Sequence, residues 1–154
     1  MRRIALLFAL LLSAQQSSLA TQSAEEEVTQ VVRGLFEAMA AADSARVREL
    51  FNPEARLIGT GGGEDGMQVR ILPIERFIAA VGGADGWNER IWDVEVRVDD
   101  NLATVWTKYD FLLHGQFSHC GVDSFQLVRT TDGWKIISIA DTRRTEGCEA
   151  PPDG

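Results

Sequence analysis

The chain contains 154 residues, of which 45% are hydrophobic and 25% are charged, and this size and composition suit one compact domain. Asp and Glu number 23 against 15 Lys and Arg, which gives a formal net charge of -8 at pH 7. Such a charge repels phosphate backbones and anionic lipid headgroups. The composition therefore argues against a chain of several domains and against a nucleic-acid partner.

The first twenty residues predict a secretory signal peptide. Basic residues at Met1–Arg3 precede the apolar run Ile4–Leu12, and Ser18-Leu19-Ala20 places small residues where a signal peptidase cleaves. The apolar run is too short to span a hydrocarbon core of ~30 Å. We therefore expect a signal peptide over residues 1–20, a secreted or periplasmic mature protein, and no membrane partner after cleavage.

Secretion favours a disulfide between the two cysteines, Cys120 and Cys148. The alternative is a metal site in which His114 and His119 join these cysteines, but His-x4-His-Cys is not a recurrent zinc spacing. We therefore expect a disulfide, no metal and no cofactor.

Three helices are predicted in the first half of the chain. Ser23-Ala24-Glu25-Glu26 has the form of a capping box. It precedes one apolar stripe at helical spacing, made of Val28, Val31, Val32, Leu35, Phe36 and Met39. Asp43 or Ser44 is expected to cap a second, short helix that carries Val47, Leu50 and Phe51 and ends at Asn52-Pro53. Pro73 is expected at the first position of a third helix, with Ile74, Phe77, Ile78 and Val81 as its stripe and Gly82-Gly83 at its end.

A glycine-rich stretch lies between two predicted strands, 55–60 and 67–71. Gly61-x-Gly63-x-x-Gly66 matches a dinucleotide-binding pattern, but Glu64 and Asp65 would repel a pyrophosphate, and a strand rather than a helix follows. We therefore interpret the stretch as a flexible loop.

The second half predicts a four-stranded antiparallel meander, because the apolar period changes from helical to two after Arg90. Its strands are expected over residues 90–98, 102–113, 117–129 and 134–143. Helices followed by such a sheet indicate an α+β fold with the helices on one sheet face. The domain is expected to cover residues 21–148, followed by a disordered tail over 149–154.

Counting outward from tight turns predicts which residues lie opposite one another. The expected rows on one face are Trp92, Tyr109, Gly121 and Arg144; Val94, Thr107, Asp123 and Thr142; Val96, Val105, Phe125 and Ala140; and Val98, Ala103, Leu127 and Ser138. This face is apolar at one end and polar and aromatic at the other, so we expect a ligand pocket at the polar end. Its predicted ligand-binding residues are Trp92, Thr107, Tyr109, Phe111, His119, Asp123, Thr142 and Arg144.

The opposite face is expected to carry several large apolar side chains, namely Trp106, Val122, Val128, Ile137 and Ile139. They are too many for a solvated face, which predicts a homodimer through this surface.

Several segments resemble a known superfamily. Leu50-Phe51-Asn52-Pro53-Glu54-Ala55 after a short capped helix, and a meander closing on Asp132-Gly133-Trp134-Lys135-Ile136, resemble the nuclear transport factor 2-like superfamily, which includes ketosteroid isomerases and polyketide cyclases. Within it, Phe117–Leu127 and Asp141-Thr142-Arg143-Arg144 are similar to the group called putative lumazine-binding proteins, and the resemblance covers about residues 25 to 148. It implies N-terminal helices on a strongly curved antiparallel sheet, a cone-shaped half-barrel with a helix-lidded cavity that is often dimeric.

Enzymes of this superfamily place an Asp or His base, and sometimes a Tyr donor, in an apolar cavity. Asp123, His119 and Tyr109 are of these types and are the catalytic candidates. For Asp123 we favour a structural carboxylate held by Thr107 and Thr142 or by Arg144, with a lowered pKa.

Three functions remain open from the sequence. The favoured one is binding of a small, partly apolar molecule in the cone. The alternatives are an isomerase, cyclase or dehydratase that uses an Asp or His base, and a structural or interaction module whose cavity is filled by its own side chains.

Overall fold

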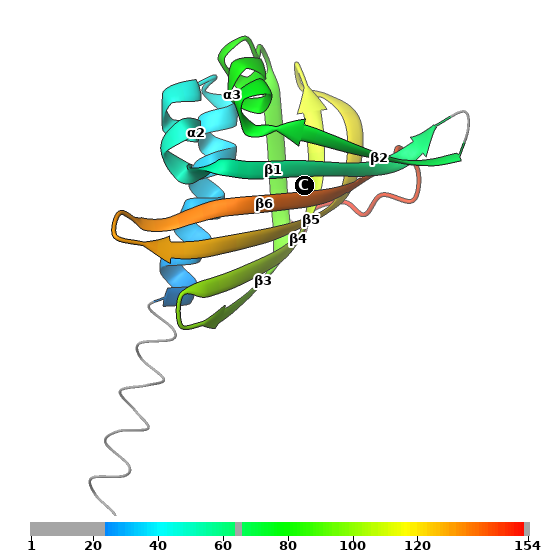
Figure 1. Cartoon of the computed structure of the whole chain (residues 1–154). Helices are drawn as coiled ribbons and strands as arrows, with labels where there is room; N and C mark the ends of the chain where they lie inside the picture. The colour runs from blue at the N-terminus through cyan, green and yellow to red at the C-terminus, as the bar shows by residue number, and fades with distance from the viewer. Residues whose placement is uncertain (1–23, 64–65, 153–154) are drawn as a thin grey trace, which may run out of the picture.

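A computed structural model of the chain describes residues 24–63 and 66–152 (Figure 1). The predicted signal peptide, and Ser23 of the predicted capping box, lie outside the described residues. The described part begins with a helix over residues 24–40. The elements that follow are α2 (Ser44–Leu50), β1 (Phe51–Gly63), β2 (Gly66–Pro73), α3 (Ile74–Gly82), β3 (Trp87–Asp99), β4 (Leu102–Leu113), β5 (Gln116–Thr130) and β6 (Gly133–Arg143). No described helix is both long enough and apolar enough to cross a membrane.

The predicted helices are confirmed, with changes at two ends. Asp43 caps α2, because its Oδ1 accepts a hydrogen bond of 2.9 Å from the Arg46 backbone N–H. Phe51 begins β1 instead of ending this helix, since the following Asn52-Pro53 favours extended backbone. Pro73 is the N-cap of α3 rather than its first residue.

The strands of the described part form one six-stranded sheet in the order β2-β1-β6-β5-β4-β3. The antiparallel meander from β3 to β6 is confirmed. The sheet as a whole is mixed rather than antiparallel, because β1 pairs in parallel with β6. The helices lie on one side of it, as predicted (Figure 1). Their apolar stripes pack on the inner sheet face, where Phe36 meets Phe125 edge to face at 6.1 Å.

The glycine-rich stretch is largely strand, so its interpretation as a loop is wrong. β1 and β2 remain paired out to Gly63 and Gly66, and only Glu64 and Asp65 between them are not described. Backbone hydrogen bonds of the hairpin hold this segment although it lacks side chains that could pack.

The register of β4 and β5 is confirmed. Thr107 lies opposite Asp123, Tyr109 opposite Gly121, and Phe111 opposite His119.

The predicted register of β3 fails at its start. The pairing of β3 and β4 shifts between Trp92 and Glu95, so Ile91 rather than Trp92 lies opposite Tyr109. Trp92 instead lies opposite Lys108, a residue of the outer face. One extra residue on one strand explains this result, because it moves every side chain before it to the other face.

The predicted register of β6 is off by one residue in its second half. Asp123 lies opposite Asp141 instead of Thr142, and Phe125 lies opposite Ile139 instead of Ala140. A further shift lies between Gln126 and Leu127. Asp141 and Ile139 therefore face inward, whereas they were expected on the outer face.

Gly121 lets three strands approach closely beside this site. A Cβ atom at Gly121 would lie 1.8 Å from the Thr142 carbonyl oxygen and 2.7 Å from the Tyr109 ring. Because Gly121 has no side chain, the Tyr109 ring can lie close to β6 at this position.

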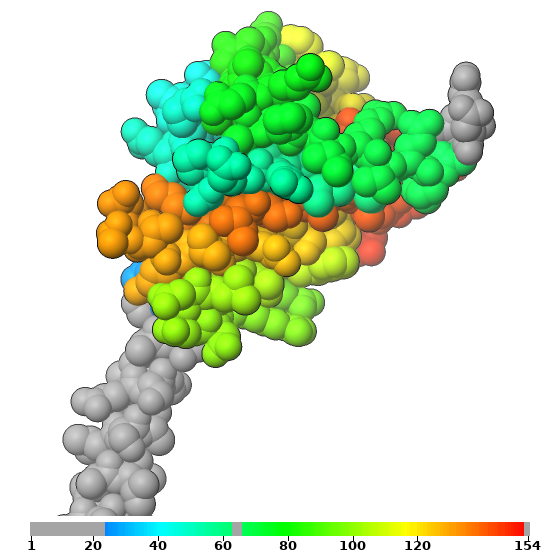
Figure 2. Space-filling model, in the orientation of Figure 1, coloured from blue at the N-terminus to red at the C-terminus, as the bar shows by residue number. Residues whose placement is uncertain are grey.

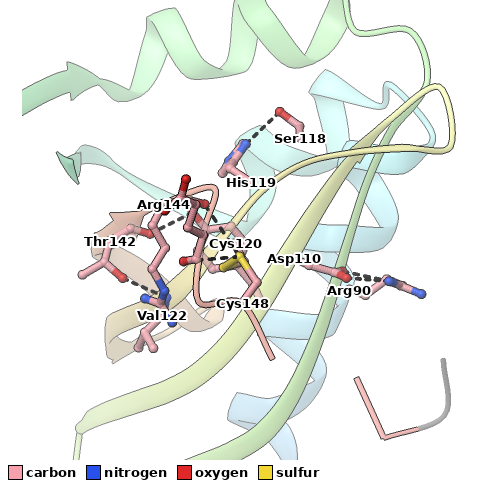
Figure 3. The surroundings of a disulfide bond; sticks show 11 residues. Arg90, Asp110, Ser118, His119, Cys120, Val122, Thr142, Arg144 and Cys148 are labelled. Carbon is pink, nitrogen blue, oxygen red and sulfur yellow. Dashed lines mark hydrogen bonds and ion pairs between the residues drawn. A yellow bond between two sulfur atoms is a disulfide. The ribbon is translucent and has the colours of Figure 1, made fainter. Parts of the chain in front are cut away.

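The predicted disulfide between Cys120 and Cys148 is present (Figure 3). Cys120 pairs with Arg144 rather than with the expected Thr145. The bond holds the segment after β6 against β5, on the outer side of the sheet.

Candidate ligand-binding site

A cavity of about 590 Å³ lies between the helices and the inner face of the sheet. Its apolar wall includes Leu35 and Met39 of the first helix, Phe77 of α3, and Leu57 and Ile139 of the sheet. A volume of this size is typical of pockets that hold small molecules. The predicted alternative of a cavity filled by the protein's own side chains is therefore wrong.

Aromatic rings form a second wall. The rings of Trp87 and Phe111 meet edge to face with their centroids 5.7 Å apart. Phe111 also stacks on the His119 ring, with the centroids 5.0 Å apart. Tyr109 meets the His119 ring edge to face, with the two ring centroids 5.8 Å apart. These rings come from β3, β4 and β5, so the register of three strands fixes the surface that they present to the cavity.

Three carboxyl groups line the same cavity: Glu89 of β3, Asp123 of β5 and Asp141 of β6. Asp123 is only 3% exposed, and Asp141 lies directly opposite it on the neighbouring strand. No described cation forms an ion pair with any of the three. The buried Oδ2 atom of Asp141 has no hydrogen-bond partner.

Burial and mutual repulsion favour the protonated forms of these acids. Burial, and then the nearby Asp141, raise the pKa of Asp123 to about 8. Burial and the neighbouring Asp123 raise the pKa of Glu89 well above its usual value. Burial also raises the pKa of Asp141, and the Arg143 guanidinium opposes this rise. Asp123 is therefore a carboxyl group that can donate as well as accept hydrogen bonds near neutral pH.

Tyr109 and His119 are held by contacts within the protein. The Tyr109 hydroxyl donates a hydrogen bond of 2.9 Å to the Thr142 carbonyl oxygen, and burial raises the pKa of this phenol. Ser118 Oγ lies 3.0 Å from His119 Nδ1 (Figure 3). Burial, followed by the charge of Arg143, lowers the pKa of His119 to about 4, so its ring is neutral at pH 7.

The structure brings half of the predicted ligand-binding residues to the cavity. Tyr109, Phe111, His119 and Asp123 line it, whereas Trp92, Thr107, Thr142 and Arg144 are not among the lining residues.

The register and local hydrogen bonds explain why three of these four residues do not line the cavity. The shift in β3 turns Trp92 to the other face. The Thr107 hydroxyl donates to the Trp92 carbonyl oxygen at 2.9 Å, and the Thr142 hydroxyl accepts from the Val122 N–H at 3.0 Å. Neither hydroxyl holds Asp123, and the lowered pKa expected for this residue is wrong.

Sequence reasoning missed Trp87, Glu89, Asp141 and Arg143, all of which line the cavity. Trp87, Glu89 and Ile91 alternate with polar residues, so the period of two could have been followed upstream of Arg90. In β6 no such signal was present, because a period of two continued from Trp134 and Ile136 leads to Thr142, and only the register shift between Gln126 and Leu127 turns Asp141 inward.

Among the residues that the structure describes, no group of three or more His, Cys, Asp or Glu side chains is arranged to hold a metal ion. Both cysteines of the metal site considered above are bonded to each other.

Comparison with solved structures identifies the fold. An NTF2-like protein with a cystatin-like fold from Novosphingobium aromaticivorans matches with a TM-score of 0.66 at 16% identity, over 89% of this chain and 90% of that chain. A nuclear transport factor 2-like superfamily protein from Salmonella enterica matches with a TM-score of 0.65 at 16% identity, over 87% of this chain and 99% of that chain. A protein from Streptomyces avermitilis, described as a "putative dehydratase from the NTF2-like family", matches with a TM-score of 0.64 at 19% identity, over 80% and 98%. The fold is thus that of the nuclear transport factor 2-like proteins.

The family follows from the sequence itself. Residues 23–140 match the family described as "Putative lumazine-binding", and the chain belongs to this family. No curated protein matches the chain.

Proposed function

We propose that the protein binds a small, partly apolar molecule in the cone cavity. The observation that carries this proposal is one cavity of about 590 Å³ with an apolar wall and three carboxyl groups, of which Asp123 is buried. Apolar surface that leaves water contributes about 25 cal/mol per Å² to binding. The carboxyl groups would fix the orientation of the ligand.

Blockage of the cavity tests this proposal. Ala79 and Ala80 are neighbouring exposed residues of α3, but only Ala80 lines the cavity. N-phenyl-1-naphthylamine, a neutral dye that fluoresces in apolar surroundings, serves as the probe. We expect Ala80→Phe to weaken dye binding by about tenfold or more, because the ring takes space in the cavity, and Ala79→Phe to leave it unchanged.

Native mass spectrometry of protein from its own host adds an independent readout, in which a bound small molecule appears as added mass. Equal dye binding by both variants, together with no added mass, would contradict the proposal.

The second candidate function is acid–base catalysis on a molecule in the cavity. It is supported by Asp123, a buried carboxyl whose pKa of about 8 lies close to neutral. The test incubates the molecule that co-purifies with the protein in D₂O. If the molecule takes up deuterium with the wild type but not with Asp123→Asn, an isomerase, cyclase or dehydratase is supported. If uptake is the same with both proteins, Asp123 is not the catalytic base.

We also propose that the protein works outside the cytoplasm, as a secreted or periplasmic protein. The disulfide between Cys120 and Cys148 supports this location, because such bonds persist in oxidising compartments. The intact mass of the protein from the host reports whether cleavage follows Ala20.

A further inference from the structure

We infer that the ligand of this cavity is an organic cation, with an ammonium or similar group among Glu89, Asp123 and Asp141 and an aromatic or aliphatic body along the apolar walls. The inference rests on the proposed function and names the chemical class of its ligand.

The charges around the cavity are unbalanced. Glu89, Asp123 and Asp141 face it together with two arginines, Arg70 and Arg143. Both arginines are exposed, and neither forms an ion pair with a described carboxylate. The neutral His119 adds no positive charge at pH 7, and Tyr109 keeps its proton. Arg143 acts on all three carboxyl groups through its charge but forms an ion pair with none of them, so their charge is only partly balanced.

Two observations point to a missing partner at this cluster. The Oδ2 atom of Asp141 is buried and has no hydrogen-bond partner, although buried polar atoms are nearly always paired. Asp123 is almost fully buried and lines the cavity, and no described hydroxyl or cation binds its carboxylate. Its neighbour Glu89 is another acid and supplies no positive charge. A ligand ammonium carries several N–H donors and a charge, so it would satisfy both groups.

Asp141 lies beside a glycine of the neighbouring strand. Gly59 of β1 pairs with Asp141, and a Cβ atom at Gly59 would lie 3.4 Å from Asp141 Oδ1. The carboxylate thus lies over a position of β1 that carries no side chain, and Gly59 and Asp141 both line the cavity.

The aromatic wall suits the same ligand. Trp87, Phe111 and Tyr109 border the cavity beside the acids, and the faces of aromatic rings attract cations. The net charge of -8 favours the approach of a cation from solution as well.

The pH dependence separates a cation from a neutral ligand. A cation binds the ionised carboxylates, so its affinity should rise with pH until Asp123 has ionised at a pH of about 8. A neutral ligand that accepts a hydrogen bond from a carboxyl group should instead bind less tightly over the same range. The other groups that face Asp123 are Glu89, Asp141 and Arg143, and their interactions are part of its shift.

Three indoles of matched shape serve as probes in isothermal titration calorimetry: tryptamine as the cation, tryptophol as the neutral molecule and indole-3-acetate as the anion. We expect tryptamine to bind about tenfold more tightly than tryptophol at a pH of about 8, and indole-3-acetate to bind most weakly. Tryptamine affinity should increase between a pH of about 6 and about 8, with release of protons to the buffer.

Charge-neutral variants identify the groups responsible. Asp141→Asn should abolish the preference for tryptamine over tryptophol, whereas Asp132→Asn, the same change on the exposed turn before β6, should retain it. Glu89→Gln, with the outer-face Glu95→Gln of the same strand as its control, provides a second pair if Asp141→Asn does not fold.

Equal binding of tryptamine and tryptophol, or a tryptamine affinity that falls with pH, would overturn the inference. Cavity binding itself would still stand if the naphthylamine dye binds and Ala80→Phe blocks it. If the dye binds and Ala80→Phe blocks it, but none of the three indoles binds, the inference of a cation site is also wrong. Loss of dye binding as well would remove the proposed function.

Discussion

Asp123 shows how one residue can be correctly located and wrongly interpreted. Its position opposite Thr107 was predicted correctly by counting from the β4–β5 turn, and a register shift between Phe111 and Leu112 lies between the turn and this pair. Its environment depends on β6, which places Asp141 beside it instead of the hydroxyl of Thr142. A carboxylate beside hydroxyl donors has a lowered pKa, whereas a carboxyl buried beside two other acids has a raised one.

The raised pKa of Asp123 predicts a pH-dependent effect of Asp123→Asn on stability. Between its ordinary pKa of 3.8 and the native value of about 8, the folded protein binds a proton that the unfolded chain releases. The free energy of unfolding therefore falls as pH rises through this window. Asn cannot ionise, so the variant should melt like the wild type at a pH of about 3, below both pKa values, and should be more stable than the wild type by on the order of 5 kcal/mol at a pH of about 9.

Thermal melts of both proteins across this pH range provide the measurement, with the exposed Asp99→Asn as the matched change. A variant that is less stable than the wild type at high pH would show that Asp123 is a stabilising carboxylate.

Strand β6 shows how much one residue of register decides at the scale of an element. Trp134, Ile136 and Ile139 are buried in the core, although an uninterrupted strand cannot place residues 136 and 139 on one face. The shift between Gln126 and Leu127 absorbs the extra residue. It is this bulge that turns Asp141 into the cavity and Thr142 away from it.

This register predicts losses of stability of different size for two isoleucines of β6. Ile139 is 7% exposed and belongs to the core, whereas Ile137 is only half-buried. Ile139→Asp should lower the free energy of unfolding by about 3–5 kcal/mol, because it buries an unpaired charge. Ile137→Asp should cost about 1 kcal/mol or less. Urea denaturation of the two variants measures both changes, and a larger loss for Ile137→Asp would contradict the register.

At the scale of the whole molecule, the outer sheet face retains an apolar surface even though Ile139 is not part of it. Ile58, Ala140, Ser124 and Trp106 form one row across four strands of this face, and Trp106 is 52% exposed. Figure 2 shows atoms of β1, β6 and β3 exposed on the side turned away from the helices. We propose a homodimer in which Trp106 of each copy packs over the small residues Ser124 and Ala140 of the other.

The dimer predicts that Trp106→Glu is monomeric in solution, because the charge would be buried without a partner. Sedimentation velocity of the wild type and the variant gives the oligomeric state. Phe117→Glu removes another half-exposed aromatic side chain near the start of β5, and this variant should remain dimeric. A wild-type protein that sediments as a monomer ends this proposal.

The sequence by itself determined the α+β class, the three helices with their buried stripes, the meander and the bonded cysteines. These features depend on local spacing and on turns, which residues close in the chain encode. Tertiary structure decided the parallel pairing of β1 with β6 and the register shifts in β3 and β6. Such pairings depend on packing between distant segments, and a shift of one residue exchanges the two faces of a strand. For that reason Tyr109, Phe111 and His119 of the aromatic wall were found from the sequence, whereas Trp87 and the acids Glu89 and Asp141 emerged from the fold.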